Sequence, residues 1–520
     1  MASSHSLVVL CILVAVFGNS SAEQSRGLAE EIQLAEYIAN KRPSINLRYR
    51  LRYHVAPPVG WMNDPNGFSY YKGRYHLFYQ FYPYNSSWGP MHWGHSSSAN
   101  LVDWVELPTA LIPEKEQCFS GSGVVDGDKL VLIYTGHQLT STEPYYNESQ
   151  YIATSTDGIN FSKYVGNPVL KSAPNDSPDF RDPKVWKYGD YWYAVIGSKT
   201  DDKHGRVLLY KTPDLINWEY LSIIGESNGT MGYMWECPDF FELNGKFILL
   251  MSPQGMAPQG DRYKNTFQTG YIIGSFNYTT NKFVPEVDFQ EIDFGHDFYA
   301  TQTLENGGRR IMVAWFGMWE VPYPEAQDGW AGAMTIMREL TLVGNRIIQK
   351  PVAAMNNLRQ STHTVTTFAS NQEIEFEKTA EINVLSMDLT KSVSILITGT
   401  NGGGQAWIKW DPAVKKVIVD RGSNDIRQVE WTPIGAQSWR LFLDASSLEL
   451  FCGEGEVVFS SRVYPDGNWK VTNLSPVSLN IEAYYLRTSV PFPYNASTSL
   501  TPILGIILLL SLLLPVIPTL

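Results

Sequence analysis

The sequence predicts an all-β chain in which a five-bladed β-propeller is followed by a β-sandwich. Three observations support this fold class: a strand motif that recurs about every sixty residues, turn motifs at matching places in several repeats, and a change of pattern after about residue 345. Little helical periodicity accompanies the repeats. A long period filled with strands and turns indicates sheet units arranged around an axis.

The recurring motif is a turn with Gly, Asn or Asp that leads into an apolar and aromatic strand. The first apolar or aromatic residues of the five copies are Tyr75, Leu130, Tyr191, Phe247 and Ile311. The steps between them are 55, 61, 56 and 64 residues, so each unit has room for the four short strands of one propeller blade. Outer hairpin turns are expected late in the units, at residues 100–104, 156–161 and 213–218.

Changes in pattern divide the chain into six segments. After residue 345 the turns are rich in glycine and separate strands with a different alternation, which is typical of a two-sheet sandwich. We therefore expect a signal peptide at 1–22, an N-terminal lead-in at 23–50, the propeller at 51–345, a linker at 346–360, the sandwich at 361–490, and a spacer with a hydrophobic tail at 491–520.

Both ends of the chain predict an extracellular protein. An apolar core at Leu7–Phe17, followed by small residues up to Ala22, is typical of a secretory signal peptide. Ile503–Leu520 is almost wholly apolar and follows small residues at 495–497. This arrangement favours a signal for a glycosylphosphatidylinositol (GPI) anchor over a tail-end transmembrane helix or a weak association. We expect the protein in the medium, or at the cell surface with membrane attachment through this tail.

Eight Asn-X-Ser/Thr sequons after the signal predict a glycoprotein. They begin at Asn85, Asn147, Asn160, Asn175, Asn228, Asn277, Asn473 and Asn495. Asn175 and Asn473 are the weakest, because Pro178 and Pro476 directly follow their serines.

Composition excludes several other classes of protein. The net charge of -12 argues against nucleic acid as a partner, because a polyanion does not attract an acidic chain. Cys118, Cys237 and Cys452 are too few and too widely spaced for a disulfide framework or a zinc site. His92–His95 is too short and isolated for a metal site, and no phosphate-cradling Gly-rich loop precedes a helix. We expect no metal and no cofactor.

Three acidic residues precede the strand motif in three different repeats. Asp64, Asp182 and Glu236 lie 11, 9 and 11 residues ahead of the first apolar residue of their units. Singly, each has a plain structural interpretation, since the two aspartates precede prolines in turns and the glutamate could be a core ion-pair partner. Together they occupy corresponding places, which converge around the central channel of a propeller. We expect three carboxylates at one mouth.

Carboxylates that converge among aromatic side chains are typical of glycoside cleavage. One acid protonates the leaving oxygen, while another attacks the anomeric carbon or activates water there. Candidate apolar faces for sugar rings are Trp61, Trp88, Trp235, Tyr299 and Trp315. Candidate hydrogen-bond partners for sugar hydroxyls are Asn63, Gln80 and Ser120. Cys237, beside Glu236, is interpreted as a small buried side chain and not as a nucleophile.

At these motifs the chain resembles the beta-fructofuranosidase family (glycoside hydrolase family 32), which includes invertases, levanases, inulinases and fructan exohydrolases. The resemblance covers about Tyr53 to Arg487. It rests on residues 61–67, 78–80, 88–95, 119–122, 181–183 and 235–239. Within these motifs Met62, Phe119 and Arg181 are also expected to contact the substrate.

The resemblance implies a five-bladed propeller joined to a β-sandwich, and hydrolysis with retention at a terminal beta-fructofuranoside. Asp64 would be the nucleophile, Glu236 the acid and base, and Asp182, beside Arg181, the stabiliser of the transition state. Such a role requires the pKa of Glu236 to be raised, through burial and neighbouring carboxylates. Ala445 stands where the family has an arginine, which is expected to loosen the contact between the domains.

Sucrose is the expected substrate, and other interpretations stay open at this point. One is a fructan exohydrolase acting on inulin or levan, and another is a propeller hydrolase that inverts a different furanoside. A third is a non-catalytic, sugar-binding propeller at the cell surface. Substrate preference, oligomeric state and the sequons in use do not follow from the sequence.

Overall fold

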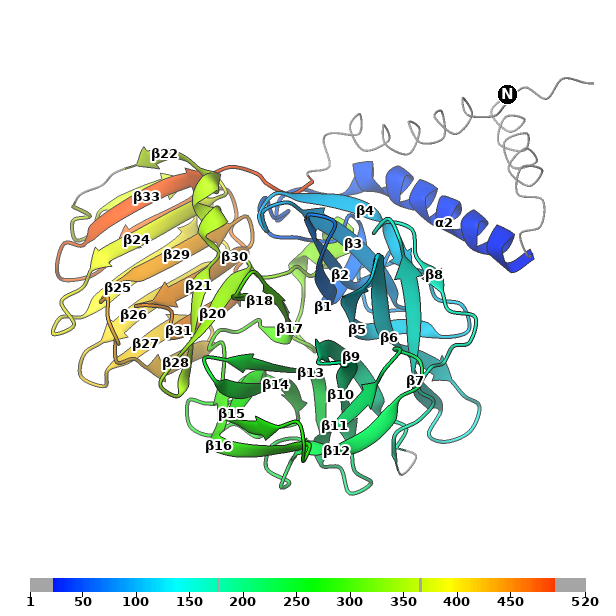
Figure 1. Ribbon diagram of the computed structural model, residues 1–520. Helices are drawn as coiled ribbons and strands as arrows, with labels where there is room; N and C mark the ends of the chain where they lie inside the picture. Colours follow the sequence, from blue (N-terminus) through cyan, green and yellow to red (C-terminus); the bar gives the residue numbers. More distant parts are fainter. Residues whose placement is uncertain (1–21, 175–176, 364–366, 492–520) are drawn as a thin grey trace, which may run out of the picture.

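The computed structural model describes residues 22–174, 177–363 and 367–491, which form two bodies built of β-strands (Figure 1). The expected signal peptide, up to residue 21, and the hydrophobic tail, from residue 492, lie outside the described residues. Within the described ranges no helix is both long enough and apolar enough to span a membrane. The lead-in carries a helix that the sequence did not suggest, α2 (Ala22–Lys41), which packs Leu34 and Ile38 against the first blade.

Five antiparallel sheets make up the propeller. The first three are formed by β1 (Gly60–Tyr71), β2 (Arg74–Tyr82), β3 (His92–Ser98) and β4 (Trp104–Leu111); by β5 (Gln117–Asp126), β6 (Lys129–Leu139), β7 (Tyr146–Ser155) and β8 (Ser162–Lys163); and by β9 (Phe180–Tyr188), β10 (Tyr191–Lys199), β11 (Gly205–Thr212) and β12 (Glu219–Glu226). The last two are formed by β13 (Met234–Leu243), β14 (Lys246–Gln254), β15 (Gly270–Asn277) and β16 (Lys282–Glu291), and by β17 (Tyr299–Asn306), β18 (Arg309–Trp315), β20 (Arg338–Val343) and β21 (Arg346–Pro351).

The predicted repeat is confirmed strand by strand. Every residue that marked a copy of the motif lies in the second strand of its blade, namely in β2, β6, β10, β14 and β18. The expected hairpin turns connect the third and fourth strands of the first three blades. In two of them an aspartate caps the turn, because Asp157 and Asp214 each accept hydrogen bonds from the backbone two and three residues later.

The ring is closed by a crossover between the fifth blade and the first. After β18 the chain forms the short strand β19 (Trp330–Ala331), which pairs in parallel with the start of β1. The innermost strands β1, β5, β9, β13 and β17 contact one another in ring order. Equivalent residues of successive blades therefore meet at the axis.

The linker predicted at 346–360 begins later in the structure. Residues 346–351 form β21, the outer strand of the fifth blade, after a tight turn at Gly344 (φ +59°). Pro351 stands at the end of this edge strand, where proline interrupts no ladder. The connection itself is the short 3-10 helix η4 (Ala353–Leu358).

The second body is a sandwich of two six-stranded sheets (Figure 1). One sheet contains β22 (Arg359–His363), β33 (Asn480–Leu486), β24 (Ala380–Ser386), β29 (Trp439–Asp444), β30 (Ser447–Cys452) and β31 (Val457–Arg462). The other contains β23 (Glu373–Phe376), β32 (Trp469–Asn473), β25 (Val393–Gly399), β26 (Gln405–Asp411), β27 (Lys416–Asp420) and β28 (Ile426–Glu430). Alternate residues of β25 and β26 are buried, as expected for strands with one face toward a core.

Next to Ala445, carboxylates of the sandwich bind residues 52–54 of the propeller domain. The neighbouring Asp444 accepts hydrogen bonds from the backbone N–H groups of Arg52 and Tyr53, and from Nδ1 of His54 at 2.8 Å. Nε2 of His54 lies 2.9 Å from Glu449. Burial alone would lower the pKa of His54, but hydrogen bonds to the two carboxylates raise it. A buried ion cluster thus holds residues 52–54 against the sandwich.

Candidate active site

Each innermost strand is irregular at the same place, near the end at which its blade begins. The ladder shifts register between Met62 and Pro65, Cys118 and Gly121, Arg181 and Lys184, Glu236 and Asp239, and Tyr299 and Thr301. Asp182, Cys237 and Ala300 within these bulges have positive φ angles of 65°, 47° and 50°. A bulge redirects a side chain out of its sheet, so five equivalent bulges direct side chains to one end of the axis.

Asp64 is held by a chain of hydrogen bonds from two blades. Asn63 Nδ2 donates to its Oδ1 at 3.0 Å, and Ser120 Oγ of the second blade donates to its Oδ2 at 2.6 Å. Trp61 Nε1 in turn donates to Asn63 Oδ1 at 2.8 Å, which fixes the orientation of the amide. The carboxylate is partly exposed and its oxygens point in defined directions.

Asp182 and Cys237 connect the third and fourth blades. The backbone N–H of Cys237 donates to Asp182 Oδ2 at 2.9 Å, and its Sγ lies 3.5 Å from Asp64 Oδ2 and 3.7 Å from Asp182 Oδ2. Burial raises the pKa of the Asp182 carboxyl well above its usual value, Glu236 adds to this, and Arg181 opposes it. Burial also raises the pKa of Cys237 well above its usual value, so the group stays a thiol, as expected from the sequence.

Glu236 receives hydrogen bonds on both carboxyl oxygens. Arg181 Nε donates to Oε1 at 2.9 Å, while Tyr299 Oη and Gln254 Nε2 donate to Oε2 at 2.6 and 2.8 Å. The side chain is 16% exposed. Burial raises the pKa of Glu236, against the opposing effects of Arg181 and the Tyr299 hydrogen bond, and Asp64 raises it further. Such a group can hold a proton and still reach a ligand at the mouth.

The structure therefore brings together the three acids that the sequence placed in equivalent positions. Cys237 is the common neighbour, because it follows Glu236 in the chain and contacts both Asp64 and Asp182. Ser120, Asn63, Arg181 and Tyr299 were also predicted for the site, and each contacts one of the acids directly.

Some of the aromatic side chains near the acids are exposed to solvent, and others are buried and pack behind them. Trp61 stacks on Trp319, with ring centroids 6.0 Å apart and planes 26° from parallel. Trp315 is fully buried behind them, with its centroid 5.9 Å from that of Trp61. Trp88 is 46% exposed and meets the edge of the partly exposed Phe119. Trp88 and Phe119 are thus free to contact a sugar, whereas Trp315 positions Trp61.

Besides Trp315, three of the residues predicted to contact substrate lie in the interior of the protein. Met62 is fully buried in the core that joins the first and fifth blades, because it points to the opposite side of β1 from Trp61. Trp235 is buried in the core of the third and fourth blades and donates to the Met231 carbonyl at 2.7 Å. Gln80 is buried and donates to the Cys118 carbonyl at 2.9 Å, so it supports the backbone beside Phe119.

Sequence reasoning missed four residues that support the site: Gln254, which bonds Glu236; Trp319, which stacks on Trp61; and Glu148 and Asp179, which bond Arg181. Of these four, Asp179 was the easiest to predict from the sequence, because it lies two residues before Arg181. Glu148 lies in the third strand of its blade and Gln254 at the end of the second strand of its blade, and both are outside the repeated motif.

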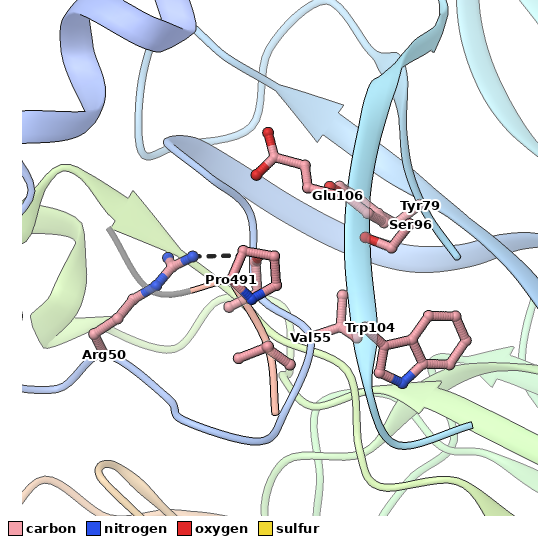
Figure 2. Close-up of a pocket in the computed structure, with 9 residues that line it drawn as sticks. Arg50, Val55, Tyr79, Ser96, Trp104, Glu106 and Pro491 are labelled. Atoms are coloured by element: carbon pink, nitrogen blue, oxygen red, sulfur yellow. Dashed lines mark hydrogen bonds between the residues drawn. The ribbon is translucent and has the colours of Figure 1, made fainter. Parts of the chain in front are cut away.

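A small pocket lies away from these acids, where the lead-in crosses the first blade (Figure 2). Arg50, Tyr79, Trp104, Glu106 and Pro491 are among the residues that line it. Its volume of about 10 Å³ admits one water molecule and no sugar. None of the predicted site residues lines it.

Comparison with known proteins places this geometry in a family. The model described as the glycosyl hydrolases family 32 N-terminal domain matches residues 54–351, and that described as the family 32 C terminal matches residues 344–483. The chain belongs to glycosyl hydrolase family 32. It is therefore a glycoside hydrolase of the beta-fructofuranosidase family, in agreement with the resemblance seen in its motifs.

Relatives of this family 32 enzyme align over most of its length. It is 42% identical to a sucrose-6-phosphate hydrolase of Zymomonas mobilis (80% of this chain, 86% of that protein) and 36% identical to a raffinose invertase of Escherichia coli (81% and 91%). Among solved structures, the beta-fructofuranosidase of Bombyx mori is 61% identical with a TM-score of 0.88, covering 89% of this chain and 99% of that one. A variant of the Bombyx enzyme, with an aspartate replaced by alanine, was solved with sucrose.

The division between exposed and buried tryptophans gives a testable difference. Trp88→Ala should raise KM for the substrate about tenfold with little change in Tm, because it removes an exposed stacking face of about 1–1.5 kcal/mol. Trp315→Ala should lower the free energy of unfolding by about 3–5 kcal/mol, because it leaves a cavity behind Trp61. Steady-state kinetics and thermal unfolding of both variants check this. Equal losses of Tm would contradict the assignment of Trp88 to the mouth.

Proposed function

We propose that this family 32 enzyme hydrolyses the beta-fructofuranosidic bond of sucrose with retention of configuration. The observation that carries the proposal is the convergence of Asp64, Asp182 and Glu236, with Glu236 in surroundings that raise its pKa. The similarity to the Bombyx mori beta-fructofuranosidase, at 61% identity over nearly its whole length, supports the substrate.

In the first half of the reaction Asp64 attacks C2 of the fructosyl unit. Its hydrogen bonds from Asn63 to Oδ1 and from Ser120 to Oδ2 hold the carboxylate in a fixed orientation for that attack. Glu236 gives its proton to the glycosidic oxygen as the bond to C2 breaks, and glucose leaves. Asp182 accepts hydrogen bonds from fructosyl hydroxyls and stabilises the positive charge that develops at C2.

In the second half a water molecule attacks C2 and displaces Asp64. Glu236, now a carboxylate, takes a proton from that water, and fructose is released with the enzyme restored. Tyr299 and Arg181 donate to Glu236 in its ionised form, which favours this half of the cycle.

Substitution of the two reacting carboxylates tests the mechanism. Asp64→Ala and Glu236→Ala should each reduce kcat for fructose release by several orders of magnitude, because a nucleophile or an acid/base group is lost. Glu242→Ala is the matched control, since this exposed glutamate lies on the same strand as Glu236 and should change kcat by less than about twofold. Retention of near-normal activity in Asp64→Ala, or inversion at C2 observed by NMR, would refute the proposal.

The relatives include several named sucrose-6-phosphate hydrolases, and the charges near the acids favour unphosphorylated sucrose. Every side-chain nitrogen of Arg181 already faces a carboxylate, of Glu236, Glu148 or Asp179. With Asp64 and Asp182 also present, a phosphate group close to this cluster would meet an excess of negative charge.

A substrate panel tests this choice. We expect kcat/KM for sucrose to exceed that for sucrose 6-phosphate by tenfold or more at neutral pH, by the charge argument above. Raffinose, inulin and levan belong in the same panel, because a fructan exohydrolase is the alternative to a sucrose-specific enzyme. Faster turnover of inulin or levan than of sucrose would favour that alternative, and a preference for the phosphate ester would contradict the charge argument.

We also propose that the protein is secreted or anchored at the cell surface, and that it is glycosylated. The proposal rests on the signal-like residues 1–22, the apolar tail and the exposed sequons at Asn85, Asn147, Asn160, Asn228 and Asn277. Asn473 is fully buried, and its Nδ2 donates to the carbonyls of Phe368 and Val477 at 2.7 and 3.2 Å. A glycan there is incompatible with the fold.

Expression of the full chain in insect cells tests the location and the sequons together. The enzyme should appear in the medium, or be released from cells by a phospholipase specific for GPI anchors, and peptide mapping should find glycans at exposed sequons with Asn473 unmodified. Activity confined to the cytosol would refute secretion. A glycan on Asn473 of the folded, active enzyme would refute the ranking of sequons.

A further inference from the structure

We propose that Glu148 and Asp179 are positioning residues that neutralise Arg181 and thereby allow Glu236 to keep the proton it donates. This inference rests on the proposed role of Glu236 as acid and base. It assigns a function to two carboxylates that lie outside the repeated motif and touch neither Asp64 nor Asp182 in the described contacts.

Arg181 lies between Glu236 and these two carboxylates. On one side its Nε and Nη2 are both 2.9 Å from Glu236 Oε1. On the other side its Nη1 is 2.9 Å from Asp179 Oδ1 and 3.3 Å from Glu148 Oε2. The Arg181 side chain is 12% exposed, so water screens these interactions only weakly.

Glu148 and Asp179 are themselves held in place. Glu148 is buried on β7, where its Oε2 accepts the backbone N–H of Phe180 at 2.8 Å and its Oε1 faces His137 Nδ1 at 3.2 Å. Asp179 is buried just before β9 and binds Lys199 Nζ at 2.7 Å and Tyr146 Oη at 2.9 Å. Fixed neighbours of this kind keep both carboxylates against Arg181.

The charges of this cluster cancel without Glu236. Glu148 and Asp179 contribute two negative charges, and Arg181 and Lys199 contribute two positive charges. Burial favours the neutral form of Asp179, but Arg181 and Lys199 lower its pKa, so it remains ionised. An uncompensated guanidinium at hydrogen-bond distance would favour the ionised form of Glu236 and remove its proton too early. Glu148 and Asp179 offset the positive charge of Arg181. Arg181 can therefore orient Glu236 through hydrogen bonds while destabilising the protonated form of Glu236 less.

Other titratable groups also face this assembly. Asp64, Asp182, Cys237, Tyr299 and Tyr233 act on Glu236, and His137 and Tyr146 adjoin the two supporting carboxylates. The test below leaves all of them unchanged. His137 also stacks on Phe119, with ring centroids 4.3 Å apart and planes 8° from parallel, so the same support reaches an aromatic face at the mouth.

Charge-changing variants of opposite sign test the proposal through the pH profile of kcat/KM, whose basic limb reports the acid in the free enzyme. Glu148→Gln and Asp179→Asn keep the side-chain shape but remove a negative charge, so the basic limb should move to lower pH by about 0.5–1 unit. Lys199→Met removes a positive charge beside Asp179, so the limb should move to higher pH. Glu148→Asp keeps the charge and should restore most of the wild-type profile.

The outcomes separate this inference from the proposed function. A merely structural role would lower Tm, or lower kcat at every pH, and leave the limb in place; that result overturns the inference. The inference also falls if Lys199→Met moves the limb in the same direction as Glu148→Gln. If the wild-type enzyme releases no fructose, or if Glu236→Ala retains activity, the proposed function itself is refuted. The pH profiles would then not report the protonation of Glu236, and the inference falls with the proposed function.

Discussion

A closed ring of side chain to backbone hydrogen bonds is the constraint on which the site depends. The bulges lift backbone N–H groups of the innermost strands out of their own ladders, and buried N–H groups need acceptors. A side chain of each blade accepts a hydrogen bond from a backbone N–H of the next blade, with donor–acceptor distances of 2.8–3.2 Å. Asn66 accepts from Gly121, Ser122 from Val185, Asp182 from Cys237, Asp239 from Thr303, and Gln302 from Phe68. The last bond returns to the first blade, so the ring is complete.

Asp182 belongs both to this ring and to the site. Its Oδ2 accepts a hydrogen bond from the backbone N–H of Cys237. Because Glu236 directly precedes Cys237 in the same bulge, this bond fixes the position of the Glu236 backbone relative to Asp182. The same oxygen of Asp182 therefore takes part in the ring and lies in the candidate active site. A buried carboxylate that serves a structural bond and also faces two other acids has a raised pKa, and the enzyme tolerates this because Arg181 offsets part of the repulsion.

The sandwich contributes to the site indirectly, by fixing the blade that closes the ring. Arg338 on β20 is fully buried and binds Asp293 at 2.9 Å and Glu449 of the sandwich at 2.6 Å. His54, which precedes the first strand of the propeller, binds the same Glu449. These buried charges are paired and hydrogen-bonded, as such groups must be. They connect the segment before the first blade, the fifth blade and the sandwich.

The sequence by itself determined the architecture and the three acids, because a repeat of about sixty residues records both the strand order and the equivalent positions in each blade. Only the tertiary structure decided which neighbours serve them. Met62 and Trp61 are adjacent in the chain, yet Met62 packs in a core and Trp61 lies at the site, because successive strand residues alternate between faces. Glu148 and Asp179 bind Arg181 from two different blades, and contacts between blades produce no periodicity in the sequence.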